Sequence, residues 1–196
     1  MRVVVINHVT LDGVMQAPGR ADEDTRDGFE HGGWASAATT PPDPAISAAM
    51  DARMAHSDGL LLGRRTYEDL LASWNAQGGP FKEALNDTQK YVVSTTLAEP
   101  LPWPNSTLLR ADAATAVGEL KARPGRELHI IGSGELINTL MQHRLVDEFM
   151  LIIHPIVLGH GRRLFTDHAA YMTLHLDSAK TTRNGVIIAT YRSAGD

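Results

Sequence analysis

A short apolar run that ends in glycine and passes at once into a helical pattern constrains this chain most. The stretch Leu60–Leu70 reads LLLGRRTYEDL, with Gly63 between the apolar run and the helical part. A helix start exposes unpaired N–H groups and a partial positive charge, and Arg64, Arg65 and Thr66 add two cations and a hydroxyl. The stretch therefore predicts a phosphate site where a buried strand meets a helix.

The same pattern recurs at His129–Leu140, HIIGSGELINTL, where the apolar run ends at Gly132. Two such turns predict a ligand with more than one phosphate, such as a dinucleotide. The alternative for either turn alone is a plain connection between a strand and a helix, as in most α/β proteins. Because Ile137 stands where the usual dinucleotide fingerprint has a third glycine, a standard dehydrogenase is not predicted.

The size and charge of the chain narrow the class of ligand. With 196 residues, of which 43% are hydrophobic, the chain suits a single domain over residues 1–196. The formal net charge is −5 and the basic residues are dispersed, which argues against nucleic acid or a membrane as partner and favours small molecules.

The absence of cysteine excludes disulfides and thiolate metal sites, and no pair of histidines has a metalloprotease spacing, so no metal is predicted. Neither a signal peptide nor an apolar run of about 20 residues is visible, so a soluble cytoplasmic protein is expected.

The alternation of strand and helix patterns predicts an α/β fold. Arg2–Val9 is almost wholly apolar, as expected of a central strand covered on both faces. The next expected strands span Gly59–Leu62, Lys90–Ser94, Ser106–Arg110, Glu127–Ile131 and Val146–Leu158, the last with a bend at its proline. The expected helices span Asp43–His56, Arg64–Trp74, Phe81–Leu85, Asp112–Arg123 and Gly134–His143. Met172–Thr182 and Gly185–Arg192 alternate as antiparallel strands do, so we predict a mainly parallel sheet with a C-terminal antiparallel hairpin.

The segment Thr10–Pro42 is rich in Gly, Pro, Asp and Ala and has no sustained period. Irregular segments of this length in a compact domain are usually functional or mobile, and we predict a loop that covers the substrate. Asp12, Gln16, Phe29 and Trp34 are its candidates to line a pocket. The alternative is a set of exposed polar residues and one packed tryptophan.

Five motifs in this order carry a family resemblance that covers nearly the whole chain. They are TLDG at Thr10–Gly13, GRRTYE at Gly63–Glu68, KYVVS at Lys90–Ser94, IGSGEL at Ile131–Leu136 and PIVLG at Pro155–Gly159. With them the chain resembles the dihydrofolate reductase-like superfamily, and within it the group related to the reductase domain of the bifunctional riboflavin-pathway deaminase-reductase. The resemblance implies the three-layer α/β fold of that superfamily.

The resemblance also implies that NADPH binds across the carboxyl ends of the strands, with its diphosphate at the Gly63 and Gly132 turns. The cofactor-binding residues expected on this basis are Gly63, Arg64, Arg65, Thr66, Ser94, Thr95, Gly132, Ser133, Gly134, Glu135 and Leu136. NADPH is preferred over NADH because a 2′-phosphate needs cations and hydroxyl donors, whereas a 2′-hydroxyl is usually held by a carboxylate. For each residue the alternative is an ordinary surface turn.

Hydride transfer also needs a group that polarises the substrate or supplies a proton. Asp12, directly after the first strand, is the candidate catalytic residue, and its alternative role is that of an Asp-Gly turn residue. Dihydrofolate reductases carry an acid on the helix before the Gly63 strand. Asp51 lies on that segment here without a clear match, which argues against folate as the substrate.

The leading expectation is an NADPH-dependent oxidoreductase that reduces a small heterocyclic, pterin- or pyrimidine-like substrate or a carbonyl compound. One alternative is the reductase step of riboflavin biosynthesis, on 5-amino-6-ribosylamino-pyrimidine phosphate, which would need a separate deaminase. The other is a non-catalytic nucleotide-binding protein on the same fold. A homodimer is expected, because the C-terminal hairpin can expose an apolar face or edge and because the resembling group commonly forms homodimers.

Overall fold

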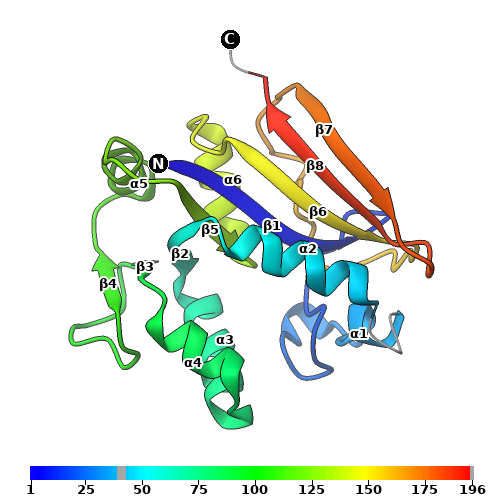
Figure 1. Ribbon diagram of the computed structural model, residues 1–196, viewed down its shortest axis with the longest axis horizontal. Helices are drawn as coiled ribbons and strands as arrows, with labels where there is room; N and C mark the ends of the chain where they lie inside the picture. Colours follow the sequence, from blue (N-terminus) through cyan, green and yellow to red (C-terminus); the bar gives the residue numbers. More distant parts are fainter. Residues whose placement is uncertain (39–42, 195–196) are drawn as a thin grey trace.

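Strand β1 (Arg2–Thr10) runs through an eight-stranded sheet in the computed structural model, which describes residues 1–38 and 43–194. The strand order is β4-β3-β2-β5-β1-β6-β8-β7. The other strands are β2 (Ser57–Gly63), β3 (Lys90–Val93), β4 (Ser106–Leu109), β5 (Glu127–Ile131), β6 (Glu148–His154), β7 (Leu174–Thr181) and β8 (Ile187–Ser193). From β4 to β6 all neighbours pair in parallel, and β8 and β7 extend the sheet in antiparallel fashion (Figure 1). The predicted sheet, mainly parallel with an antiparallel hairpin at its end, is confirmed.

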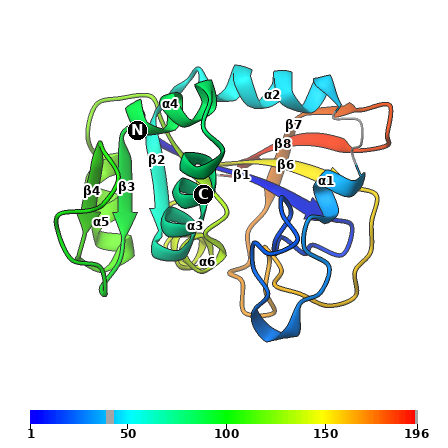
Figure 2. The ribbon, with the colours of Figure 1, turned by 90° about the horizontal axis from the view of Figure 1, so that it is seen from below.

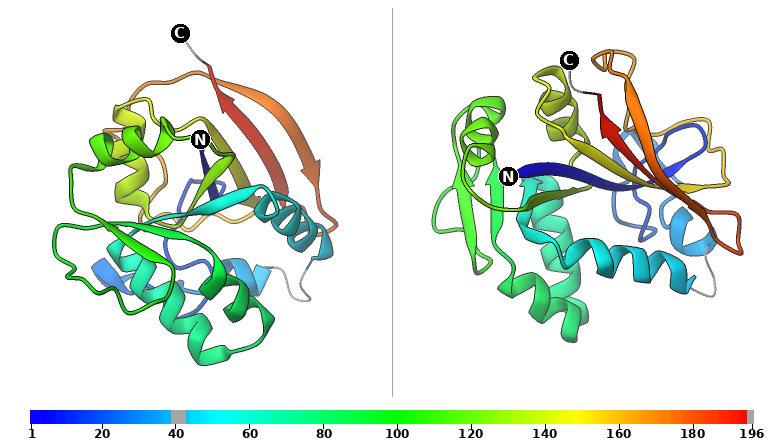
Figure 3. Two further views of the ribbon diagram at one scale, coloured as in Figure 1. Left: turned by 60° about the vertical axis from the view of Figure 1, so that its left-hand side comes forward. Right: turned by 45° about the horizontal axis from the view of Figure 1, so that its top comes forward.

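Helices cover both faces of this sheet (Figure 3). On one face lie α2 (Pro44–Met54), α3 (Arg64–Gln77) and α4 (Pro80–Asp87), and on the other lie α5 (Ala113–Lys121) and α6 (Gly134–Gln142). Val4 and Ile6 of β1 pack against α2, while Val3 and Val5 pack against α5 and α6. Because successive side chains of a strand point to opposite faces, burial on both sides explains the continuous apolar runs of the central strands.

The segment predicted as an irregular loop over Thr10–Pro42 holds more structure than its composition indicated. A 3-10 turn at Arg26–Gly28 and helix α1 (Trp34–Ala38) lie within it, whereas residues 39–42 lie outside the described part of the chain (Figure 2). Phe29 and Trp34 are buried in a small apolar cluster of their own. A helix this short has no sustained apolar period, which is why the sequence pattern does not reveal it.

Two element ends differ from the prediction for backbone reasons. Strand β6 stops at His154 instead of continuing to Leu158, because Pro155 has no N–H to donate to a neighbouring strand. Helix α3 runs on past Trp74 and ends before Gly78, which adopts a φ of +75°.

Lys90, at the start of β3, closes the C-terminal end of α4. Its ammonium group is buried and donates to the carbonyl oxygens of Leu85 at 2.7 Å, Asn86 at 3.3 Å and Thr88 at 2.5 Å. The last carbonyls of a helix have no partners within the helix, so this side chain satisfies groups that would otherwise be orphaned. Burial lowers the pKa of Lys90 to about 8.

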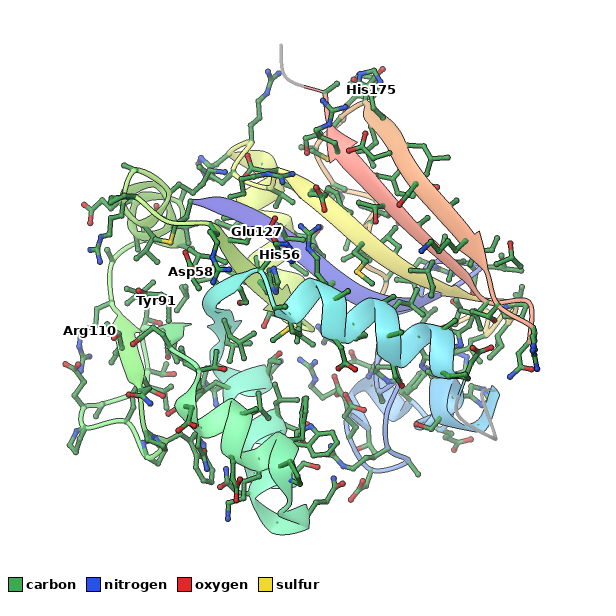
Figure 4. All side chains as sticks on the ribbon, viewed as in Figure 1. His56, Asp58, Tyr91, Arg110, Glu127 and His175 are labelled. Atoms are coloured by element: carbon green, nitrogen blue, oxygen red, sulfur yellow. The ribbon has the colours of Figure 1, made fainter. Side chains whose placement is uncertain are left out.

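Helix α2 has no fully buried residue and is held to the sheet by a buried ion-pair network. Arg53, in its last turn, pairs with Glu148 of β6 at 2.6 Å and with Glu127 of β5 at 3.0 Å. Arg2 of β1 pairs with the same two carboxylates at 2.5 Å and 3.4 Å. Figure 4 shows Glu127 beside the end of α2, where His56 lies. The network therefore fixes the position of α2 over the sheet.

The outer strand β7 is exposed along nearly its whole length. It carries His175, which lies across the sheet from Tyr91 and Arg110 at the opposite edge (Figure 4). Tyr171, just before this strand, has 91% of its surface exposed. Among the helices that the structure describes, none combines the length and the apolar character needed to cross a membrane.

We predict that Arg53→Met lowers the free energy of unfolding by about 3 kcal/mol, because Glu148 and Glu127 then share the half-exposed Arg2 as their arginine partner, with His129 bonded to Glu127 alone. Urea unfolding followed by circular dichroism measures the change. The control is Arg192→Met, which removes an exposed pair with Asp177 and is expected to leave stability nearly unchanged. Equal losses in the two variants would contradict the anchoring role of Arg53.

Candidate functional site

A cavity of about 1130 Å³ opens where β1, β2 and β5 end. In a parallel sheet the carboxyl ends of neighbouring strands meet at one edge, which is where α/β proteins bind ligands. The cavity is lined by β1 (Ile6, Asn7, His8), the start of α3 (Gly63–Thr66), the start of α6 (Gly132–Leu136), α2 (Met50) and the loop residues 15–18, 20, 22–26, 162, 163 and 166. Figure 2 shows α3 and α6 on one side of this edge and the long loop after β1 on the other.

The two glycine turns are hydrogen-bonded to each other. The Gly63 N–H donates to Ser133 Oγ at 3.0 Å, and the Ser133 N–H donates to Thr66 Oγ1 at 3.0 Å. These reciprocal bonds join the turn between β2 and α3 to the turn between β5 and α6. Arg64 and Ser133 consequently line the same cavity, as expected if successive strand ends form one cradle.

Asn7 of β1 fixes the second turn from the side. Its Oδ1 accepts the Gly132 N–H at 2.7 Å, and its Nδ2 donates to the Gly132 carbonyl at 3.3 Å. Gly132 has a φ of +64°, and a Cβ atom there would come within 3.0 Å of Thr66. Glycine is therefore required by both the backbone conformation and the close approach of the neighbouring turn.

The wall made by these turns is suited to anions. Helices α3 and α6 both begin without a side-chain cap, so their first N–H groups are not bonded by a capping residue. Arg64 pairs with Glu68 at 3.0 Å, whereas Arg65 is exposed and has no ion pair within the described ranges. Arg65 is thus a cation that remains available to a bound phosphate.

Most of the residues predicted to bind a cofactor lie on this wall. Those that line the cavity are Gly63, Arg64, Arg65, Thr66, Gly132, Ser133, Gly134, Glu135 and Leu136. Ser94 and Thr95 are not among the described lining residues, although Val93 before them is. Ser94 Oγ instead accepts the N–H groups of Thr96 and Leu97 at 3.1 Å each, so its hydroxyl stabilises the turn after β3.

Asp12 is likewise absent from the described cavity lining. Its carboxylate accepts hydrogen bonds from Thr10 Oγ1 at 2.6 Å, Leu158 N at 3.2 Å and Gly159 N at 2.8 Å. The bond from Thr10, with smaller contributions from the two N–H groups, lowers the pKa of Asp12 below its usual value. The structure thus places the Asp12 carboxylate in the turn after β1, outside the described lining of the cavity, and its catalytic role stays a prediction.

The long loop forms the opposite wall through charged side chains. Gln16 lines the cavity as predicted, whereas Phe29 and Trp34 pack behind it in their own cluster. Arg20 reaches Asp69 of α3 at 2.7 Å. In the same way, the segment after β6 is tied to α6 by an ion pair between Arg162 and Glu135 at 3.1 Å. Local sequence patterns do not reveal these pairs, because their members are far apart along the chain.

A pair of buried or half-buried histidines, of which His8 lines the cavity and His154 lies behind it, is a further feature that the sequence reasoning missed. His8 Nδ1 lies 2.8 Å from His154 Nε2, and the edge of the Trp34 ring packs against His154 at a centroid distance of 5.2 Å. Burial is the main cause that lowers the pKa of each histidine to about 4. Both imidazoles are therefore neutral near pH 7. Positions 6 and 8 share one face of β1, but no local signal predicts the partner on β6.

We predict that this pair makes the protein acid-labile. In the unfolded chain the imidazoles take up protons below pH 6.5, whereas the folded protein resists until about pH 4. The unfolding free energy should therefore fall as the pH drops from 6.5 to 4, by on the order of 3 kcal/mol for each ring. Urea unfolding of wild type and His154→Gln at several pH values measures the slope. The control is His56→Gln, at an exposed position. If the unfolding free energy of His154→Gln depends on pH as steeply as that of the control, the acid lability does not come from this histidine pair.

The part of the chain that the structure describes contains no group of three or more His, Asp or Glu residues able to hold a metal ion. Comparison with known sequences finds that the family model of the RibD C-terminal domain matches residues 2–188. The uncharacterized protein YyaP of Bacillus subtilis strain 168 is 33% identical over 145 residues, which make up 70% of this chain and 75% of that protein.

Solved structures with the same architecture include a candidate riboflavin biosynthesis protein from Shewanella sp. PV-4, with a TM-score of 0.70, 21% identity and coverage of 100% of both chains. Dihydrofolate reductase from Enterococcus faecalis, complexed with NADP(H), matches with a TM-score of 0.60 and 10% identity over 99% of this chain and 97% of its own. The fold is therefore the dihydrofolate reductase-like α/β fold. With the family model matching nearly the whole length, the chain belongs to the RibD C-terminal domain family.

Proposed function

We propose that this protein is an NADPH-dependent oxidoreductase that transfers a hydride to a small heterocyclic, pterin- or pyrimidine-like substrate or to a carbonyl compound. The observation that carries the proposal is the wall suited to anions that the Gly63 and Gly132 turns form, joined by reciprocal hydrogen bonds. Two helix N-termini and the unpaired Arg65 face one cavity, which suits a ligand with several phosphates. Family membership supports the same reading.

The residues present fit this cofactor. The first N–H groups of α3 and α6, which follow the bonded N–H groups of Gly63, Gly132 and Ser133, would hold the diphosphate. Arg65 would hold the 2′-phosphate that distinguishes NADPH from NADH. When bound, the cofactor supplies the hydride. The protein's own contribution is to hold both partners close together in a fixed orientation.

The substrate side of the cavity argues against folate. Helix α2 presents Met50 to the cavity, whereas Asp51 is exposed and is not among the described lining residues. From β1, Ile6 adds a further apolar side chain to this region and His8 adds a polar one. A substrate that does not need a carboxylate to accept the neighbouring N–H groups of folate's amino-oxo ring edge, such as another pyrimidine or a ketone, suits this lining better.

A second candidate within the same class is the reductase step of riboflavin biosynthesis, on a ribosylamino-pyrimidine phosphate. Family membership favours it. The loop side of the cavity also carries three arginines, each paired with a carboxylate that a substrate phosphate could replace: Arg20, Arg26 and Arg162. If the protein binds NADPH but does not oxidise it in the presence of any pyrimidine, quinone or pterin, it is instead a nucleotide-binding protein without reductase activity.

We predict that Arg65→Met weakens NADPH binding about tenfold and leaves NADH binding nearly unchanged, since one charge-assisted contact is worth about 1–2 kcal/mol. Titration of cofactor fluorescence measures both constants. The control Arg183→Met removes an exposed arginine in the turn between β7 and β8. Wild-type protein that neither binds nor is thermally stabilised by millimolar NADPH would overturn the proposed function.

We also propose a homodimer in which the edge strand β7 is covered. This strand is exposed along nearly its whole length, and Leu176 on it and the nearby Tyr171 are 56% and 91% exposed. Burying such an edge in a twofold contact removes both the apolar surface and the unpaired backbone groups. Sedimentation at micromolar concentration is expected to give twice the chain mass of 21.3 kDa, and a species of the single-chain mass alone would contradict the dimer.

A further inference from the structure

The orientation of His8 follows from its place in the sheet. Residues 6 and 8 of β1 share the face that packs against α2, and Ile152 of β6 is the register partner of His8, so His154 lies diagonally across on the same face. His8 Nδ1 faces His154 Nε2 at 2.8 Å. The remaining ring nitrogen, His8 Nε2, is not buried and has no hydrogen-bond partner in the described part of the chain, so it is open to the cavity.

The proton arrangement in the pair follows from the environment of His154. Its Nδ1 is buried without a hydrogen-bond partner among the described residues. An orphaned buried N–H is rarer in folded proteins than an orphaned acceptor, so Nδ1 is the unprotonated nitrogen of His154. His154 then carries its proton on Nε2 and donates it to His8 Nδ1. A neutral His8 must accordingly carry its own proton on Nε2.

We infer that the His8 Nε2–H is a fixed hydrogen-bond donor at the base of the cavity, which recognises a carbonyl oxygen or ring-nitrogen acceptor of the substrate and polarises the bond to be reduced. The part of this inference that gives His8 a role in catalysis rests on the proposed function. The donor itself is a property of the protein alone. His154 acts as a positioning residue, because it sets which nitrogen of His8 bears the proton.

The chemistry balances without a charged histidine. The carbon of the substrate's C=O or C=N bond gains a hydride, and the π-electron pair of that bond moves to the heteroatom. A solvent water molecule then protonates the heteroatom, and the hydroxide that it leaves is neutralised by the bulk solvent. The neutral His8 stabilises the developing negative charge through its Nε2–H and keeps its proton, because losing it would leave an imidazolate. The low pKa of both rings agrees with this, since an imidazolium would not be retained at neutral pH.

The support for His154 extends to the loop that covers the cavity. The Trp34 ring stands at 88° to the His154 ring, and the Trp34 Nε1–H donates to the Gln16 carbonyl at 2.7 Å. Gln16 itself lines the cavity. Loop and histidine pair therefore form one packed unit, which keeps the donor in a single orientation before a ligand arrives.

The tautomer is tested first, on ligand-free wild-type protein with ¹⁵N-labelled histidine. At pH 7 the ring-nitrogen spectrum is expected to show both His8 and His154 protonated on Nε2. The variant His154→Leu removes the donor and should convert His8 to a mixture of tautomers, whereas His154→Gln, whose amide can donate, should retain the Nε2–H form. An Nδ1-protonated His8 in wild type would overturn the inference, whatever the cofactor result.

Recognition is tested by binding of 5-aminouracil, a pyrimidine with carbonyl acceptors, to the protein saturated with NADP⁺. Its addition is expected to shift the His8 Nε2 resonance, and His8→Leu is expected to weaken its binding at least tenfold while changing the dissociation constant of NADPH less than twofold. His56→Gln serves as the control. A wild-type His8 signal that does not respond, or equal binding by His8→Leu, would overturn the inference. Failure of NADPH itself to bind wild type would instead overturn the proposed function.

Discussion

The hydrogen bonds between Ser133 and the turn at Gly63 and Thr66 are the interaction on which the rest of this structure depends. Two helix starts placed side by side bring two partial positive charges together, which is unfavourable in the absence of an anion. The Ser133 hydroxyl and the Thr66 hydroxyl each take up one backbone N–H and hold the turns in register. The N–H groups further along remain free, so the wall is assembled in advance for a negatively charged ligand.

The two sides of the cavity are held by different forces. The turn wall rests on short neutral hydrogen bonds and on the apolar core under α6. The loop wall is tied across the cavity by ion pairs, Arg20 with Asp69 and Arg162 with Glu135, whose side chains are all at least one-third exposed. Salt screens exposed charges much more than buried hydrogen bonds, so the loop side is the wall whose closure responds to ionic strength.

Features of the fold and the site could be predicted from the sequence where the residues that determine them lie close together along the chain. The strands, the hairpin and both glycine turns follow from patterns within about ten residues, and the structure agrees with them. The pair of His8 and His154 could not be predicted, because 146 positions separate its members and only the register between β1 and β6 brings them together. The positions of Asp12 and Ser94 outside the described cavity lining could not be predicted either. A polar residue after a strand has the same local sequence pattern whether it faces a ligand or bonds within a turn.

Because Lys90 is buried under the end of α4, its chemical reactivity reports when this helix detaches from the sheet. Amine-modifying reagents attack a deprotonated, accessible lysine, so Lys90 can react only when the burial that lowers its pKa is lost. While its bonds to two α4 carbonyls and to the carbonyl of the following Thr88 persist, none of its surface is exposed. The rate at which Lys90 becomes acetylated therefore measures how often α4 detaches from the sheet, a motion that no ligand-based assay would detect.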